Sequence, residues 1–157
     1  MEQRVPGNWF YEMQELGFNY RITDFQCALA SSQLRKLDGW ISRRQEIAVL
    51  YRKLLDEVGE AVLPAEPPGR EHVYHLYVIR TSRRAELAAF LKARSIQTGI
   101  HYPVPTHRQP AVERYAPPAL PATERLVDEI LTLPLSAGHS DAEIDEVAAA
   151  VRAFFEG

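Results

Sequence analysis

The sequence predicts an α/β domain of the two-layer α+β kind, in which a small mixed sheet is covered by helices. Three segments carry this prediction. Apolar residues recur with helical spacing from Ala30 to Val58 and again from Ile144 to Phe155. Between them, residues 72–80 are rich in aromatic and β-branched side chains, which is typical of a strand. Helices with a single apolar stripe need a surface to cover, and the sheet provides it.

Size and charge exclude several classes of protein. A chain of 157 residues with 46% hydrophobic residues can build one domain with its own core. The formal net charge of −3 gives no basic field for nucleic acid, and the arginine pairs at 43–44 and 83–84 are expected on solvated helix faces. No apolar run approaches the ~20 residues that span a bilayer, and the first residues lack the apolar core of a signal peptide. We therefore expect a cytoplasmic protein without nucleic-acid or membrane partners.

A polar turn precedes the first helix. Thr23 and Gln26 have the spacing of a capping box, so this helix is expected to begin at about Asp24. Asn19 and Arg21 then lie just before a helix N-terminus, where free backbone amides and the helix dipole favour an anion such as phosphate. On spacing alone, the alternative is that Asn19 only adopts a turn conformation and that Arg21 is solvated.

The apolar stripe that follows predicts one long helix or two. Gly39 lies within it and costs roughly 1 kcal/mol relative to alanine in a helix interior, so a kink or break is expected near Asp38. Cys27, the single cysteine, has apolar neighbours and is expected to be a small core residue rather than a nucleophile. Since one cysteine cannot form an internal disulfide, a reducing cytoplasm fits.

Residues 72–80 are expected to form a central strand. On that strand His72 and His75 point to opposite faces without a Cys or carboxylate partner nearby, so no metal site is predicted. Ser82 can cap a helix over residues 83–94, and residues 96–102 then complete a βαβ-like unit.

The last part of the sequence predicts a helix, a strand and a helix. The first helix runs from Leu120 to about Leu131 and is followed by a short strand at 133–135, expected at an edge because proline cannot donate to a ladder. Ser140 and Glu143 form a second capping box, at the start of the closing helix.

Several stretches closely resemble the sugar-nucleotide aminotransferases of the DegT/DnrJ/EryC1/StrS family, which are pyridoxal-phosphate enzymes of fold type I. The matching stretches are Glu15–Leu29, Gln33–Asp38, Arg43–Ala48, His72–Val78, Thr98–Ala111 and Leu133–Ser136. The resemblance implies that the chain is the small C-terminal domain of such an enzyme. Residues 1–21, with Trp9, Phe10, Tyr11 and Met13, then lead out of a missing large cofactor-binding domain, so that Met1 is an internal start or a truncation. Residues 22–60 form the interdomain helix region and residues 61–157 the small domain.

The resemblance also implies roles for five side chains. Asn19 matches the family asparagine that reaches across a dimer interface to the cofactor phosphate of the other subunit, and Arg21 matches the arginine close to the cofactor or nucleotide sugar. His101, Tyr102 and His107 match the loop near the sugar-nucleotide pocket, where imidazoles and a hydroxyl can bind sugar or phosphate oxygens. The alternative is that His101 is a strand residue and His107 a surface residue of the loop.

No catalytic residue is expected within this chain. Its lysines, Lys36, Lys53 and Lys92, fall on predicted amphipathic helices, whereas the family lysine that binds the cofactor belongs to the large domain. The chain alone is therefore expected to be inactive.

For the full-length enzyme, the resemblance implies a homodimer with shared active sites. It transfers an amino group, usually from glutamate, to a keto carbon of a UDP- or dTDP-linked deoxy sugar, for polysaccharide or glycan precursors. Residues 12–24 are most similar to the C4 aminotransferase of the pseudaminic-acid pathway, whereas residues 98–107 resemble the wider family. The alternative is a dimerisation or regulatory remnant that keeps the fold without catalysis.

Overall fold

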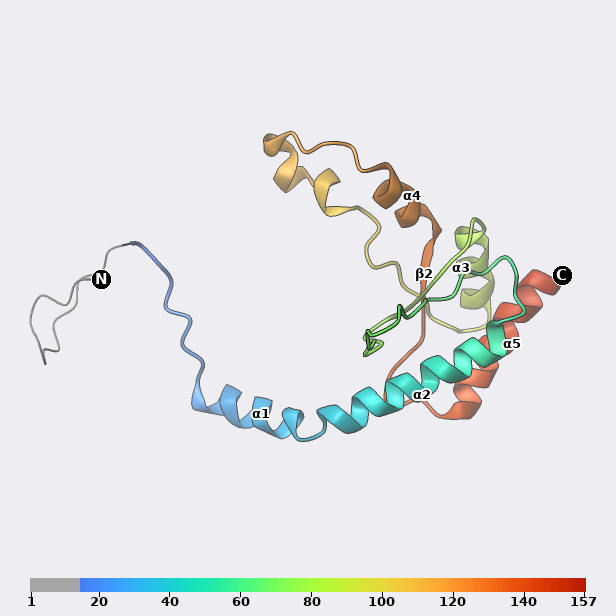
Figure 1. Ribbon diagram of the computed structural model, residues 1–157, viewed down its shortest axis with the longest axis horizontal. Helices are drawn as coiled ribbons and strands as arrows, with labels where there is room; N and C mark the ends of the chain where they lie inside the picture. The colour runs from blue at the N-terminus through green and yellow to red at the C-terminus, as the bar shows by residue number, and fades with distance from the viewer. Residues whose placement is uncertain (1–14) are drawn as a thin grey trace, which may run out of the picture. The chain divides into compact units, whose positions relative to one another are not determined.

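The computed structural model describes residues 15–157, and the chain divides into two compact units between Arg35 and Lys36. The expectations for Trp9, Phe10, Tyr11 and Met13 lie outside the described residues. The elements are α1 (Asp24–Leu34), α2 (Leu37–Leu55), β1 (Tyr77–Arg80), α3 (Arg84–Ala93), the 3-10 turns η1 (Thr106–Arg108) and η2 (Pro110–Tyr115), α4 (Pro121–Glu129), β2 (Ile130–Leu133) and α5 (Asp141–Glu156). Figure 1 labels the five α-helices and β2.

The first unit contains α1, which begins at Asp24 as predicted. The Thr23 hydroxyl accepts from the amide of Gln26 at 3.3 Å, and the Gln26 side chain accepts from the amide of Thr23 at 3.0 Å, which completes the capping box. α1 buries none of its residues. Cys27 is accordingly exposed, and its prediction as a core residue is wrong because none of the helix is covered by the described part of the chain.

The helical region is broken earlier than expected. α1 ends at Leu34 and α2 begins at Leu37, whereas Gly39 lies inside α2. The penalty for one helical glycine is only about 1 kcal/mol, which the packing of the later turns of α2 outweighs. Those turns bury Ile47, Ala48, Tyr51 and Leu55.

The arginine pairs are only partly solvated, which differs from the prediction: the side chains of Arg43 and Arg83 are 27% and 37% exposed. Arg43 donates to the carbonyl of His139 at 2.8 Å and to the carboxylate of Asp141 at 2.7 Å, which joins α2 to the start of α5. Arg44 donates to the carbonyls of Tyr74 and His75, both at 3.1 Å. In the second pair, the guanidinium of Arg83 stacks 4.3 Å from the ring centroid of Phe154, and the Nε of Arg84 is buried.

The sheet of the second unit is built on two antiparallel strands, with Tyr77 opposite Leu133 and Arg80 opposite Ile130. Single bridges extend it on both sides, since Val62 pairs with Arg80 and Gly99 pairs with Thr132, both antiparallel. The segment at Gly99 therefore runs parallel to β1 with β2 between them, which is a split form of the expected βαβ unit.

Both predicted strands are shifted. Residues 72–76 are not part of β1, because Tyr74 has a φ of 46° and Arg44 occupies the carbonyls that a ladder would need. β2 ends at Leu133 and lies at the edge of the two-stranded sheet, apart from the single bridge between Thr132 and Gly99. Pro134 follows it and, without an N–H group, stops the ladder.

Two of the predicted caps in this unit are settled by hydrogen bonds. Ser82 does not cap α3: the hydroxyl of Thr81 accepts from the amide of Arg83 at 3.2 Å instead. The capping box of α5 is present, with Glu143 accepting from the amide of Ser140 at 2.8 Å.

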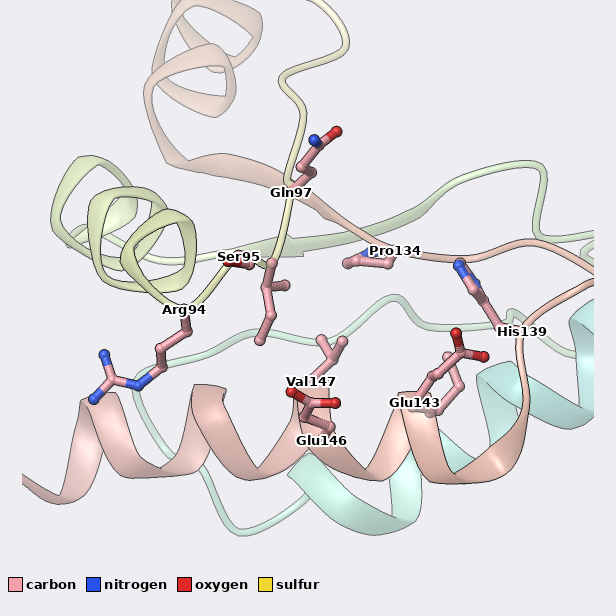
Figure 2. A pocket seen from close by; sticks show the side chains of 10 residues that line it. Arg94, Ser95, Gln97, Pro134, His139, Glu143, Glu146 and Val147 are labelled. Atoms are coloured by element: carbon pink, nitrogen blue, oxygen red, sulfur yellow. The ribbon is translucent and has the colours of Figure 1, made fainter.

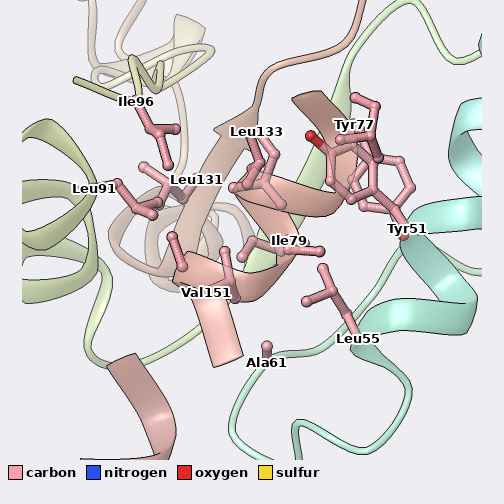
Figure 3. Packing of buried hydrophobic residues seen from close by; sticks show 14 of the residues in the cluster. Tyr51, Leu55, Ala61, Tyr77, Ile79, Leu91, Ile96, Leu131, Leu133 and Val151 are labelled. Carbon is pink, nitrogen blue, oxygen red and sulfur yellow. The ribbon is translucent and has the colours of Figure 1, made fainter. Parts of the chain in front are cut away.

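The hydrophobic core lies between the sheet and helices α2, α3 and α5 (Figure 3). Ile79 and Leu131 of the strands meet Leu55 of α2, Leu91 of α3 and Val151 of α5, and all five side chains are at most 1% exposed. α4 and the two 3-10 turns extend away from α2 and α5 (Figure 1). This confirms the predicted two-layer α+β arrangement and leaves the loop before α4 outside the core.

Candidate functional site

A cavity of about 480 Å³ lies between the loop that follows Gly99 and helix α4. The loop lines it with residues 101–106 and Gln109, and α4 contributes Thr123, Leu126 and Val127. Its wall on the helix side is mostly apolar, and its rim carries an imidazole, a phenol and an amide. Such a combination can hold a ligand that has both apolar carbons and polar oxygens.

His101 and Tyr102 are brought together on this cavity. Nδ1 of His101 lies 2.9 Å from the hydroxyl of Thr132 on β2, which fixes the imidazole to the sheet. Tyr102 is 72% exposed, and its ring centroid lies 5.6 Å from that of His101. The Tyr102 hydroxyl is thus accessible to a ligand, while His101 is anchored.

Gly99 allows this position of the imidazole. A Cβ at Gly99 would lie 2.5 Å from Cε1 of His101, closer than real side chains approach. Glycine is needed here because the His101 ring lies directly against the backbone.

His107 does not line this cavity. Its side chain is 9% exposed, and its Nε2 lies 2.9 Å from Oε1 of Glu124 on α4. The same oxygen accepts from Nη2 of Arg108 at 2.9 Å and from the amide of Leu120 at 3.2 Å. The hydrogen bond from His107, followed by those from Leu120 and Arg108, lowers the pKa of Glu124 to about 2.

Glu124 is absent from the sequence-based candidates. The one local signal for it is an acidic residue in the first turn of a helix that opens with Pro121. Its contact with His107 spans 17 residues, which no short-range pattern reports.

A second cavity, of about 340 Å³, lies between the end of α3 and α5 (Figure 2). It is lined by polar groups of both signs, including Arg94, His139, Glu143 and Glu146. Two of these are already engaged, since Glu143 caps α5 and Nδ1 of His139 accepts from the amide of Ser136 at 3.1 Å. None of the predicted site residues lines it.

Asn19 and Arg21 belong to the first unit, whereas His101, Tyr102 and His107 belong to the second. Asn19 and Arg21 are exposed and lie in the non-helical segment directly before the capped start of α1. An amide and a guanidinium there can donate to phosphate oxygens, so they fit the phosphate group of a cofactor such as pyridoxal phosphate.

The three lysines are exposed in the structure, Lys36 at the N-cap of α2 and Lys53 and Lys92 on helices.

Among residues 15–157, no three His, Cys, Asp or Glu side chains are grouped to hold a metal ion. Within the same residues, no helix is both long and apolar enough to cross a bilayer.

A family model described as the DegT/DnrJ/EryC1/StrS aminotransferase family matches residues 2–152. The chain is 41% identical over 129 residues to the "Pleiotropic regulatory protein" of Geobacillus stearothermophilus, an alignment that covers 80% of this chain and 35% of that protein. It is 39% identical over 127 residues to the dTDP-3-amino-3,4,6-trideoxy-alpha-D-glucose transaminase of Streptomyces venezuelae. This alignment covers 80% of this chain and 34% of that protein. The chain thus spans about a third of the length of these curated relatives.

Solved structures agree with these matches. S. venezuelae DesV, solved in complex with a ketimine intermediate, superposes with a TM-score of 0.88 at 36% identity, over 94% of this chain and 40% of that one. NtdA from Bacillus subtilis, solved with bound cofactor PMP, gives a TM-score of 0.84 at 26% identity, over 96% of this chain and 36% of that one.

Proposed function

Because the chain belongs to the DegT/DnrJ/EryC1/StrS aminotransferase family, we propose that it is the C-terminal part of a pyridoxal-phosphate-dependent transaminase of nucleotide-linked keto-deoxy sugars. The observation that carries this proposal is the superposition of 94% of the chain on DesV, a structure that holds a ketimine intermediate. The fold of this family is that of fold type I enzymes, so the chain corresponds to their small domain.

The cavity beside α4 supports a sugar substrate. The Tyr102 hydroxyl and the His101 imidazole can hydrogen-bond sugar or phosphate oxygens, while Leu126 and Val127 offer apolar contact to the carbon that lacks a hydroxyl. His107 acts on this site through Glu124, because its own side chain is nearly buried.

Pyridoxal phosphate supplies the electron sink that lets an amino group move between carbon atoms. In this proposal, Asn19 donates to the cofactor phosphate of the other subunit across a dimer interface, and Arg21 lies close to the cofactor or the nucleotide. Lys36, Lys53 and Lys92 are exposed and do not serve as the cofactor lysine, which the large domain contributes.

The amino donor in this proposal is glutamate, and the acceptor is a dTDP- or UDP-linked sugar. A relative that is 39% identical acts on a dTDP-linked sugar, which favours the first nucleotide. The narrower resemblance of residues 12–24 to the pseudaminic-acid enzyme stays a prediction. Cytoplasmic location and a role in surface polysaccharide or glycan precursors follow from this substrate class.

The test is direct. The chain is produced together with the cofactor-binding part that this proposal expects before it. Transfer from ¹⁵N-glutamate to dTDP- and UDP-linked deoxy sugars with a keto group at C3 or at C4 is followed by mass spectrometry. Labelled amino sugar is expected. A folded, cofactor-loaded protein that labels neither class of sugar would overturn the proposal.

A second candidate is a regulatory or dimerisation role without catalysis. It is favoured by the relative that is 41% identical, which is named a pleiotropic regulatory protein. This candidate predicts dimerisation with no amino transfer, even when the cofactor-binding part is present. The labelling experiment therefore separates the two functions.

A further inference from the structure

Several hydrogen-bond donors converge on one oxygen of Glu124. Oε1 accepts from Nε2 of His107 at 2.9 Å, from Nε and Nη2 of Arg108 at 3.1 and 2.9 Å, and from the amide of Leu120 at 3.2 Å. The first two residues belong to the loop over residues 101–109, whereas Leu120 is the N-cap of α4. A carboxylate with cationic donors forms stronger hydrogen bonds than a neutral acceptor.

The loop and α4 are also the two walls of the 480 Å³ cavity. In the part of the chain that the structure describes, every side-chain hydrogen bond between this loop and α4 ends on Glu124. The other anchor of the loop is the contact between His101 and Thr132, at its opposite end. In these residues, Glu124 therefore provides the side-chain hydrogen bonds that link the two walls.

We propose that Glu124 is a positioning residue, which fixes the loop over residues 101–109 against α4 and thereby sets the shape of the cavity for the nucleotide-linked sugar. This inference rests on the proposed function for its substrate. His107 and Arg108 are its partners, so His107 shapes the site without touching the sugar. Tyr102 and His101 remain the groups that face the ligand.

The first test needs no ligand. Amide hydrogen exchange is compared for the wild-type chain, Glu124→Gln, Glu124→Ala and the control Glu129→Gln, a carboxylate on the same helix that lies 3.7 Å from Arg125. In Glu124→Ala, exchange at Arg108, Gln109 and Leu120 is expected to rise about ten- to a hundredfold, because hydrogen bonds to a charged acceptor are lost. The exchange rates of these amides in Glu124→Gln should lie between those of the wild type and Glu124→Ala. In Glu129→Gln they should match the wild type. The strands β1 and β2 should keep their protection in all variants.

Two results of this test would overturn the inference. One is unchanged exchange of the loop amides in Glu124→Ala. The other is equal loss of protection in β1, β2 and the loop, since that shows a general loss of stability rather than a local release.

The second test uses the assembled holoenzyme. Glu124→Gln should raise KM for the nucleotide sugar about tenfold and leave KM for glutamate and kcat nearly unchanged, because only one wall of the sugar cavity is loosened. If the wild type is active and this variant has wild-type values of KM and kcat, the inference about Glu124 is wrong while the proposed function stands. If the wild-type holoenzyme transfers no amino group, the proposed function fails, and the hydrogen-exchange result still decides the role of Glu124 in the loop.

Discussion

At the scale of single residues, the site divides into groups that short motifs predict and groups that they do not. His101 and Tyr102 are candidates because they stand together in a recognisable stretch of sequence, and the structure places both on the cavity, while their binding of substrate stays a prediction. Glu124 could not, because its partners lie in a loop that is close only after folding. The same limit explains His107, whose burial against Glu124 no local pattern reports.

Gly99 gives a prediction at this scale. In Gly99→Ala the new Cβ would lie 2.5 Å from Cε1 of His101, so the imidazole must move and lose its contact with Thr132. Since Thr132 is only 7% exposed, we expect a loss of about 0.5–1.5 kcal/mol of stability. Thermal unfolding and the ring signals of His101 by NMR measure both effects. The control is Gly39→Ala, where the space is open and α2 should gain about 0.5–1 kcal/mol. A Gly99→Ala variant with an unmoved His101 ring would contradict this account.

The lowered pKa of Glu124 predicts how the stability of the fold depends on pH. Its pKa falls from an ordinary 4.5 to about 2 in the folded protein, so its bonds stabilise the fold fully above pH 4.5 and are lost as the pH falls toward 2. Glu124→Gln should therefore be less stable than the wild type above pH 5, and the difference should shrink as the pH falls through this window. Unfolding curves at several pH values and the carboxyl ¹³C titration of Glu124 report it. A titration midpoint near 4.5 would show that the bonds are absent in solution.

At the scale of elements, helix starts were predicted well and strand limits poorly. Both capping boxes, at Thr23 and Ser140, depend on side chains three residues apart, so the sequence contains the whole interaction. The start of β1 depends instead on Arg44, which lies 30 residues before Tyr74 and takes its carbonyl. The position of β2 depends on pairing with Gly99, another contact that forms only in the fold.

The two capping boxes have the same chemistry but should differ in their effect. Ser140→Ala removes a cap from α5, which buries six residues in the core, so the whole second unit should lose about 1 kcal/mol and its Tm should fall. Thr23→Ala removes the cap of α1, which buries none, and should reduce helix content while leaving that Tm unchanged. Circular dichroism records both quantities. Equal shifts of Tm in the two variants would contradict the division of the chain at Arg35.

At the scale of the whole molecule, the described part of the first unit exposes several large apolar side chains. Leu16, Phe18 and Tyr20 are 93%, 84% and 89% exposed, and Phe25 on α1 is 79% exposed. Patches of this kind mark interaction surfaces or promote aggregation. We therefore expect the isolated chain to self-associate and to bind an apolar dye, as measured by light scattering and dye fluorescence. A monodisperse monomer at high concentration that binds no dye would argue against this expectation.

Asn19 is the residue of the first unit that the proposed function places at the dimer interface. If its amide donates to the cofactor phosphate of the other subunit, Asn19→Ala loses a hydrogen bond to a charged group, worth about 1.5–3 kcal/mol. The affinity of the assembled enzyme for pyridoxal phosphate should then fall about ten- to a hundredfold, while folding should hardly change, because Asn19 is exposed. Thr23→Ala is the matched control, since it should weaken α1 and disturb the cofactor only through the neighbouring turn.

A mixture of two impaired variants, assayed at a pyridoxal-phosphate concentration too low to load Asn19→Ala, tests whether the site is shared. Subunits that carry Asn19→Ala keep the cofactor lysine, and subunits without that lysine keep Asn19. In a heterodimer of the two, the one site with an intact lysine takes its Asn19 from the other chain, so amino transfer should return toward half of the wild-type rate per dimer. If heterodimers form and no activity returns, Asn19 acts within its own subunit or only in the turn before α1, and the shared site is wrong.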